Sequence, residues 1–167
     1  MKKQSKRIAA CGVTAALGVV IMLLGNVFGL GMYLAPMLVG LSLTAIGKEW
    51  GIKYQLLLWI AIGLLSMIMV SNLEQNLMFI GLFGWYPVFR PVLQKWKLLP
   101  RVVVKFLIFN VIVVALEAFL ILVLVLESLG TGLTILLLVL GNVTFFVYDF
   151  AIPRFEFLAA RYLKKIK

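Results

Sequence analysis

Histidine is absent from this chain of 167 residues, and cysteine occurs once, at Cys11. A lone cysteine excludes an internal disulfide and any zinc site built from several cysteines. Without histidine, haem ligation through imidazole and metal sites of the histidine type are excluded as well. We therefore expect neither a metal site nor a cofactor.

Charged residues are scarce too, at 13% of the chain, whereas hydrophobic residues make up 64%. Soluble domains have about 25% charged and about 45–50% apolar residues, so this composition excludes a soluble fold and also disorder. A membrane-spanning helix needs roughly 20 residues, which leaves room for about six or seven spans. We expect an all-α, polytopic integral membrane protein in which residues 1–167 form a single domain.

Hydropathy and turn residues divide the chain into six predicted spans, at about residues 8–26, 32–47, 54–71, 77–89, 102–126 and 131–150. The fourth span would rise only about 20 Å, which is short for a bilayer core of roughly 30 Å. We expect it to be short or tilted, with a kink at Pro87. Residues 127–130 are predicted to form a turn, and the sixth span is predicted to end before Pro153.

The basic residues orient these spans. The N-terminal tail, residues 47–53, residues 90–105 and the C-terminal tail carry four, two, five and five of them, which accounts for all 16. The alternate turns carry none, and two of those turns carry an acid, Glu74 or Glu127. Because cytoplasmic loops are rich in Lys and Arg, both termini are expected in the cytoplasm, and the location is expected to be the bacterial cytoplasmic membrane. This pattern also accounts for the net charge of +10 without a nucleic-acid partner.

Polar side chains within the spans are few, and they are pairwise seven residues apart. Asn110 and Glu117 lie on the fifth span, and Asn142 and Asp149 lie on the sixth. Seven residues are nearly two helical turns, so each pair shares one face, which we expect to point into the bundle. Asn110 and Asn142 lie at similar depth and could form a hydrogen bond between helices, worth roughly 0.6–2 kcal/mol.

The two carboxylates on these faces differ in their expected surroundings. Asp149 is near Arg90, Lys105 and Arg154 in depth, which predicts a salt bridge at the membrane boundary. Glu117 has no Lys or Arg within two turns of its own helix. It must therefore pair with a hydroxyl or amide, be protonated, or face a water-filled cavity. A substrate or proton site and a protonated structural carboxyl are the two hypotheses for it.

Small residues on the first span are spaced four apart, as Cys11 and Ala15 and again as Gly12 and Ala16. Such pairs let helices approach closely. They indicate either packing inside the bundle or a smooth face for a partner membrane protein. Catalytic motifs are missing, because no Gly-x-Ser-x-Gly, His-Glu-x-x-His or Walker A sequence occurs, and we expect no enzymatic activity.

Taken together, this organisation resembles the S components of energy-coupling factor transporters. Six short spans, both termini inside, fewer than 200 residues, a first helix rich in small residues and a basic linker before the fifth span carry the resemblance. It implies a substrate-binding subunit that takes up a vitamin or other micronutrient and docks on a transmembrane T component with two ATPases. By the same resemblance, the first-span positions Cys11, Gly12, Ala15 and Ala16 would contact the T component.

The resemblance also implies an outward cavity between the outer halves of spans four to six. The candidate residues for binding a small-molecule substrate there are Glu117, Glu74, Asn76, Asn110 and Asn142. A carboxylate in that cavity would favour a cationic or amine-bearing ligand. Two other functions stay open, namely an accessory or assembly membrane protein without a transported substrate, and a carrier that acts alone.

Overall fold

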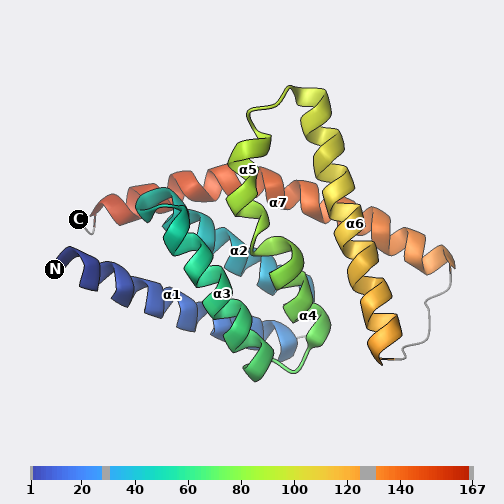
Figure 1. The fold of residues 1–167 in the computed structure, drawn as a ribbon, viewed down its shortest axis with the longest axis horizontal. Coiled ribbons are helices and arrows are strands. Elements are labelled where there is room, and N and C mark those ends of the chain that lie inside the picture. Colours follow the sequence, from blue (N-terminus) through green and yellow to red (C-terminus); the bar gives the residue numbers. More distant parts are fainter. Residues whose placement is uncertain (1, 28–30, 125–130, 166–167) are drawn as a thin grey trace.

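The computed structural model of the chain describes residues 2–27, 31–124 and 131–165 (Figure 1). In chain order the helical elements are α1 (Lys2–Val27), α2 (Gly31–Trp50), α3 (Ile52–Met69), α4 (Leu73–Met78), the π-helix η1 (Phe79–Phe83), α5 (Tyr86–Leu93), α6 (Leu98–Leu124) and α7 (Thr131–Lys165). No strand occurs within these ranges, which confirms the all-α prediction. Each predicted span overlaps a helical segment, and the predicted turn at 127–130 lies outside the described residues.

Four of these helices are long and apolar enough to cross a membrane. The segments are Gln4–Val27 in α1, Ile52–Met69 in α3, Leu98–Leu122 in α6 and Leu138–Leu158 in α7. Among the described residues, α2 and the segment from α4 to α5 do not reach that standard. The latter segment is divided into short pieces, and α2 packs against six other helical elements.

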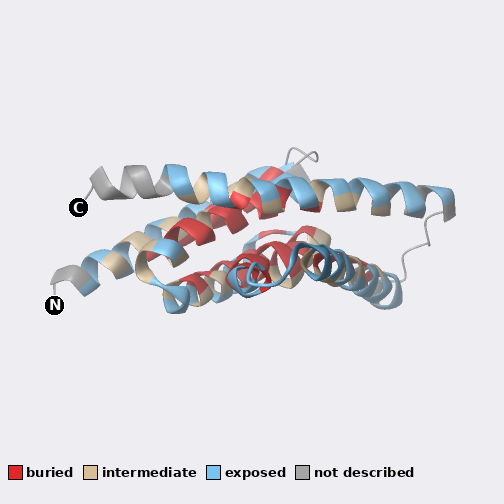
Figure 2. Ribbon diagram, turned by 90° about the horizontal axis from the view of Figure 1, so that it is seen from above, coloured by how far each residue is buried: buried red, intermediate tan, exposed pale blue. Residues whose placement is uncertain are grey.

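Helix α2 lies at the centre of the fold and contacts α1, α3, α7 and the segment from α4 to α5. Its opposite faces belong to two clusters of buried side chains. Val39 and Leu43 pack with α1 and α3, whereas Met37 and Leu41 pack with η1, α5, α6 and α7. Figure 2 shows the buried residues concentrated in the middle of the molecule, while much of α6 and α7 is exposed. The central helix therefore joins two otherwise separate cores.

The small-residue stripe of α1 turns toward this core. Cys11, Ala15, Gly18 and Met22 are buried against α2 and α3. A Cβ atom built at Gly18 would lie 2.9 Å from Ile62 Cδ1, so glycine permits the close approach of α1 and α3 there. Of the four predicted docking positions, Cys11 and Ala15 thus lie inside the molecule, whereas Gly12 and Ala16 are exposed.

The segment predicted as one short helix kinked at Pro87 has a different form. It consists of α4, one π-helical stretch closed by the hydrogen bond from Gly84 N to Phe79 O (2.8 Å), a break at Gly84 and Trp85, and then α5. The break precedes Pro87, which stands in the first turn of α5. Proline is tolerated at that position because the first N–H groups of a helix have no intrahelical acceptor.

Helix α7 likewise continues through Pro153 to Lys165, beyond the predicted end of the sixth span at about residue 150. A proline inside a helix leaves the carbonyl four residues earlier without its N–H donor. In α7 that carbonyl belongs to Asp149, and it accepts a hydrogen bond from Arg90 Nη2 at 3.3 Å. A side chain from another helix thus replaces the missing donor.

Candidate functional site

A cavity of about 230 Å³ lies between α2, α4, η1, α6 and α7. Its wall is mainly apolar and includes Met78, Phe83 and Val113. The polar side chains in the wall belong to Tyr33, Glu117 and Thr144. We call this space the Glu117 cavity. A concave, apolar site with few polar groups is the usual form of a small-molecule binding site.

Among the described residues, Glu117 is the only carboxylate in that wall, and it lies on the buried side of α6. Lys105, Phe109 and Val113 are buried on this helix, and Glu117 follows Val113 by four residues, so its side chain continues the same stripe. Among the described residues, none donates a hydrogen bond to the Glu117 carboxylate. A cationic ligand in the cavity would supply a partner that the described residues do not.

Glu74 reaches this site indirectly. The Tyr33 hydroxyl donates a hydrogen bond to Glu74 Oε1 at 2.5 Å, which ties α2 to the first turn of α4. Tyr33 lines the Glu117 cavity, but Glu74 is not among its lining residues. No motif in the sequence points to Tyr33. Its role depends on the meeting of α2 with α4, which no local pattern reveals.

Asn76 lies elsewhere. Its side chain is 1% exposed, and its Nδ2 donates to Val70 O at 2.9 Å, which closes the link between α3 and α4. The neighbouring Gln75 donates from Nε2 to Met22 O at 2.7 Å and so ties α4 to α1. Asn72 accepts a hydrogen bond from Gln75 N and begins α4 as its N-cap. The residues predicted as a loop are therefore the capped start of a helix, and Asn76 does not line the Glu117 cavity.

Asn110 and Asn142 meet as the depth estimate predicted. Asn110 Nδ2 donates to Asn142 Oδ1 at 2.9 Å, and Asn142 Nδ2 donates to Asn110 Oδ1 at 3.0 Å. Each Nδ2 also donates to a carbonyl one turn earlier on its own helix, at 2.8 Å. Because both amides are occupied with each other, they act as a link between α6 and α7 and are poor candidates for holding a solute.

Asp149 is held by three side-chain donors from two elements, α5 and α6. Its Oδ1 accepts from Tyr86 Oη at 2.6 Å and from Arg90 Nε at 2.8 Å, and its Oδ2 accepts from Lys105 Nζ at 2.6 Å. The predicted salt bridge is thus confirmed for Arg90 and Lys105, whose exposed fractions are 7% and 4%. Arg154 instead lies over the Phe150 ring, 4.1 Å from its centroid. We call Asp149, Tyr86, Arg90 and Lys105 the Asp149 cluster.

A second cavity, also of about 230 Å³, lies between α2, α3, α5 and α7. It is more polar than the first, with Thr44, Gln55 and Lys48 in its wall and Glu156 on α7. Lys48 Nζ lies 3.3 Å from Glu156 Oε2, and this ion pair is largely exposed. We call this space the Glu156 cavity.

Comparison with known proteins gives no match: no protein-family model, no curated protein and no solved structure resembles the chain closely enough. Among the described residues, no group of three or more Asp, Glu or Cys side chains is gathered as a metal site would require. What the molecule can do therefore follows from its own geometry, which offers one carboxylate in an apolar cavity with no donor among the described residues.

Proposed function

We propose that the chain is a membrane-embedded subunit that binds a small cationic solute for uptake in the Glu117 cavity and works with a separate ATPase module. The single observation that supports the solute class most is the Glu117 carboxylate. It stands in an apolar wall without a hydrogen-bond donor from the described residues. An apolar body that carries one amine or other cation would bury its surface there and pair with that carboxylate.

The membrane part of the proposal is supported by the exposed apolar faces of α6 and α7. Large hydrophobic side chains with about half or more of their surface exposed follow one another along both helices: Leu107, Val111, Val114, Leu122, Ile135, Val139, Val143 and Val147. Contiguous apolar surface of this extent is rare on soluble monomers and is compatible with lipid. A bilayer is thus the first partner of this chain.

The orientation with both termini inside is supported by where the basic segments lie. In Figure 1 both ends of the chain and the link between α2 and α3 lie toward the left, and the link between α5 and α6 lies at the top. The link between α3 and α4, which carries no basic residue, lies at the bottom. With six crossings in a bacterial cytoplasmic membrane, a protease-sensitive tag at either terminus should be cleaved in inside-out vesicles and protected in intact spheroplasts.

The binding experiment uses benzylamine and its uncharged counterpart benzyl alcohol as probes of the purified full chain. We expect benzylamine to raise the melting temperature and benzyl alcohol to have a smaller effect. In Glu117→Gln the benzylamine affinity should fall about tenfold to a hundredfold, since a hydrogen bond to a charged group is worth about 1.5–3 kcal/mol. Glu49→Gln, at a residue that lines neither cavity, is the matched control. Unchanged affinity in Glu117→Gln contradicts the proposal.

Dependence on an ATPase module is tested by purification from the native host in mild detergent, followed by mass spectrometry. Two ATPases and a larger membrane protein that accompany the chain would support the subunit hypothesis. A chain that purifies alone would favour the solitary carrier or the accessory protein. The benzylamine result then separates these two, because only the carrier requires a solute site.

A further inference from the structure

The Glu117 cavity and the Glu156 cavity are both lined by α2, by the segment from α4 to α5 and by α7. We call the boundary along which these three elements pack the seam, and the two cavities lie at its opposite ends. Helix α2 contributes Tyr33 to the first cavity and Thr44 to the second. These residues are separated by about 16 Å along the helix axis at 1.5 Å per residue. The two cavities are therefore distinct spaces on the same helix.

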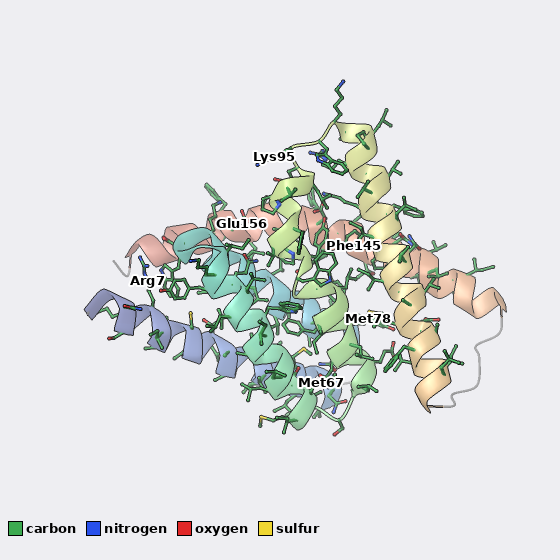
Figure 3. All side chains as sticks on the ribbon, in the orientation of Figure 1. Arg7, Met67, Met78, Lys95, Phe145 and Glu156 are labelled. Atoms are coloured by element: carbon green, nitrogen blue, oxygen red, sulfur yellow. The ribbon has the colours of Figure 1, made fainter. Side chains whose placement is uncertain are left out.

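In the segment from α4 to α5 and in α7, as in α2, the residues of the Glu117 cavity precede those of the Glu156 cavity along the chain. The segment from α4 to α5 contributes Phe83 to the Glu117 cavity and Val88 to the Glu156 cavity, and α7 contributes Thr144 and then Glu156. In Figure 3, Phe145 lies between Met78, which lines the first cavity, and Glu156, which lines the second. All three elements run in the same direction from one cavity to the other, so the seam connects them.

Between the cavities the backbone of α2 at Gly40 lies against the Phe83 carbonyl, and the Tyr148 side chain of α7 reaches both. The Tyr148 hydroxyl donates to Phe83 O at 2.8 Å, and the Tyr148 side chain is fully buried. A Cβ atom at Gly40 would clash with both the Tyr148 hydroxyl and the Phe83 carbonyl. Only glycine leaves room for this contact, which closes the seam. We call Gly40, Phe83 and Tyr148 the seam contact.

The seam contact lies beside the interruption between the π-helix η1 and α5. Pro87 has no N–H, so the Phe83 carbonyl receives no helical hydrogen bond from that position. The hydrogen bond from Tyr148 takes its place. Because the π-helical stretch and the break at Gly84 lie directly beside it, α5 can move relative to α4 without disrupting a continuous helix.

We propose that the two cavities are the ends of one solute pathway between α2, α5 and α7, which the seam contact closes in this conformation. The inference rests on the proposed function for the solute that enters the Glu117 cavity. It goes beyond that function because the solute would cross the membrane through this chain itself. Opening requires the Tyr148 hydroxyl to leave Phe83 O. It also requires α5 to separate from α2 and α7, which breaks the hydrogen bonds of Tyr86 and Arg90 to Asp149.

Thiol accessibility tests this pathway without knowledge of the natural solute. In a Cys11→Ser background, Thr144→Cys reports on the Glu117 cavity and Lys48→Cys on the Glu156 cavity. The probe is 2-(trimethylammonium)ethyl methanethiosulfonate, a small cation that does not cross lipid. In right-side-out and inside-out vesicles, we expect each cysteine of the otherwise unchanged chain to react from its own side only.

Two variants should open the seam. Gly40→Ala forces the backbones apart, and Tyr148→Phe removes only the hydrogen bond to Phe83. We expect each to raise the rate of labelling from the opposite side at least tenfold. Gly12→Ala is the matched control, since a Cβ atom there meets nothing within 4 Å. If Gly40→Ala fails to elute as a single species in detergent, Tyr148→Phe carries the test.

Labelling rates from the opposite side that stay at the Gly12→Ala level in the folded variants would overturn the pathway. Equal labelling of the unchanged chain from both sides would overturn the closed seam. Benzylamine binding is measured on the same variants, because its absence contradicts the proposed function while the labelling still decides the pathway. The two failures are thereby distinguishable.

Discussion

Asp149 on α7 and Glu117 on α6 are both carboxylates within long apolar helices, yet their surroundings are opposite. Asp149 accepts hydrogen bonds from Tyr86, Arg90 and Lys105. Glu117 lines a cavity and receives none from the described residues. In a low-dielectric interior a paired carboxylate holds its neighbours in place, whereas an unpaired one is available to a ligand. Donor geometry, more than residue type, thus separates a structural from a binding role.

The largest expected effect comes from removing the paired carboxylate. Asp149→Asn leaves two buried cations, Arg90 and Lys105, without a counter-charge, and such losses cost about 3–5 kcal/mol. We expect a strong fall in thermal stability in detergent, followed by size-exclusion chromatography on heating. Lys105→Gln is the comparison, because it leaves a neutral pair of Arg90 with Asp149 and should cost clearly less. Equal losses in both variants would show that the charge balance does not matter.

A smaller effect is expected for the link between α6 and α7. A double-mutant cycle of Asn110→Ala and Asn142→Ala should give a coupling energy of about 0.6–1.7 kcal/mol, since the two amides bond mainly with each other. Unfolding in mixed micelles measures it. Additive losses would mean that the reciprocal hydrogen bonds contribute nothing beyond each residue's own packing.

Replacing the Glu117 carboxylate should not lower the stability as Asp149→Asn does. Glu117→Leu removes a group that lacks a donor in an apolar wall, so stability should stay unchanged or rise by about 1 kcal/mol. Benzylamine binding should be lost at the same time. A fall in stability comparable to that of Asp149→Asn would show that Glu117 also has a structural partner.

The smallest expected effect concerns the ion pair of Lys48 and Glu156, which is exposed to solvent. Exposed pairs contribute about 0–1 kcal/mol, so Lys48→Ala should leave the melting temperature nearly unchanged. The same measurement at high salt should show no further difference. A large loss would place this pair in a less exposed setting, closer to that of the Asp149 cluster.

Part of this arrangement could be predicted from residue spacing. The seven-residue intervals on α6 and α7 placed Asn110 opposite Asn142, and the depth of Asp149 placed it near Arg90 and Lys105. These predictions succeeded because a regular helix converts sequence distance into depth and face. Asn76 was assigned to the cavity by its place near the predicted outer turn, but its amide is used within the link between α3 and α4.

Other features depend on contacts that no local pattern contains. Tyr86 and Tyr33 each bind a carboxylate from a distant segment, and neither follows from its own helix. The break of the helix before Pro87 and the continuation of α7 through Pro153 were not predicted either. A proline removes one donor, and whether the helix continues depends on whether another side chain reaches the freed carbonyl, as Arg90 does for Asp149.

The sequence by itself determined the all-α class, the apolar helices and the helix faces on which polar groups lie, because hydropathy and the 3.6-residue period act locally. It also determined the one-sided distribution of the basic segments along the chain. Tertiary structure alone decided which carboxylate is paired, that α1 buries its small-residue stripe, and that Gly40, Phe83 and Tyr148 meet between two cavities. Those outcomes require segments far apart in the chain to meet at atomic distance, and no interval in the sequence encodes that distance.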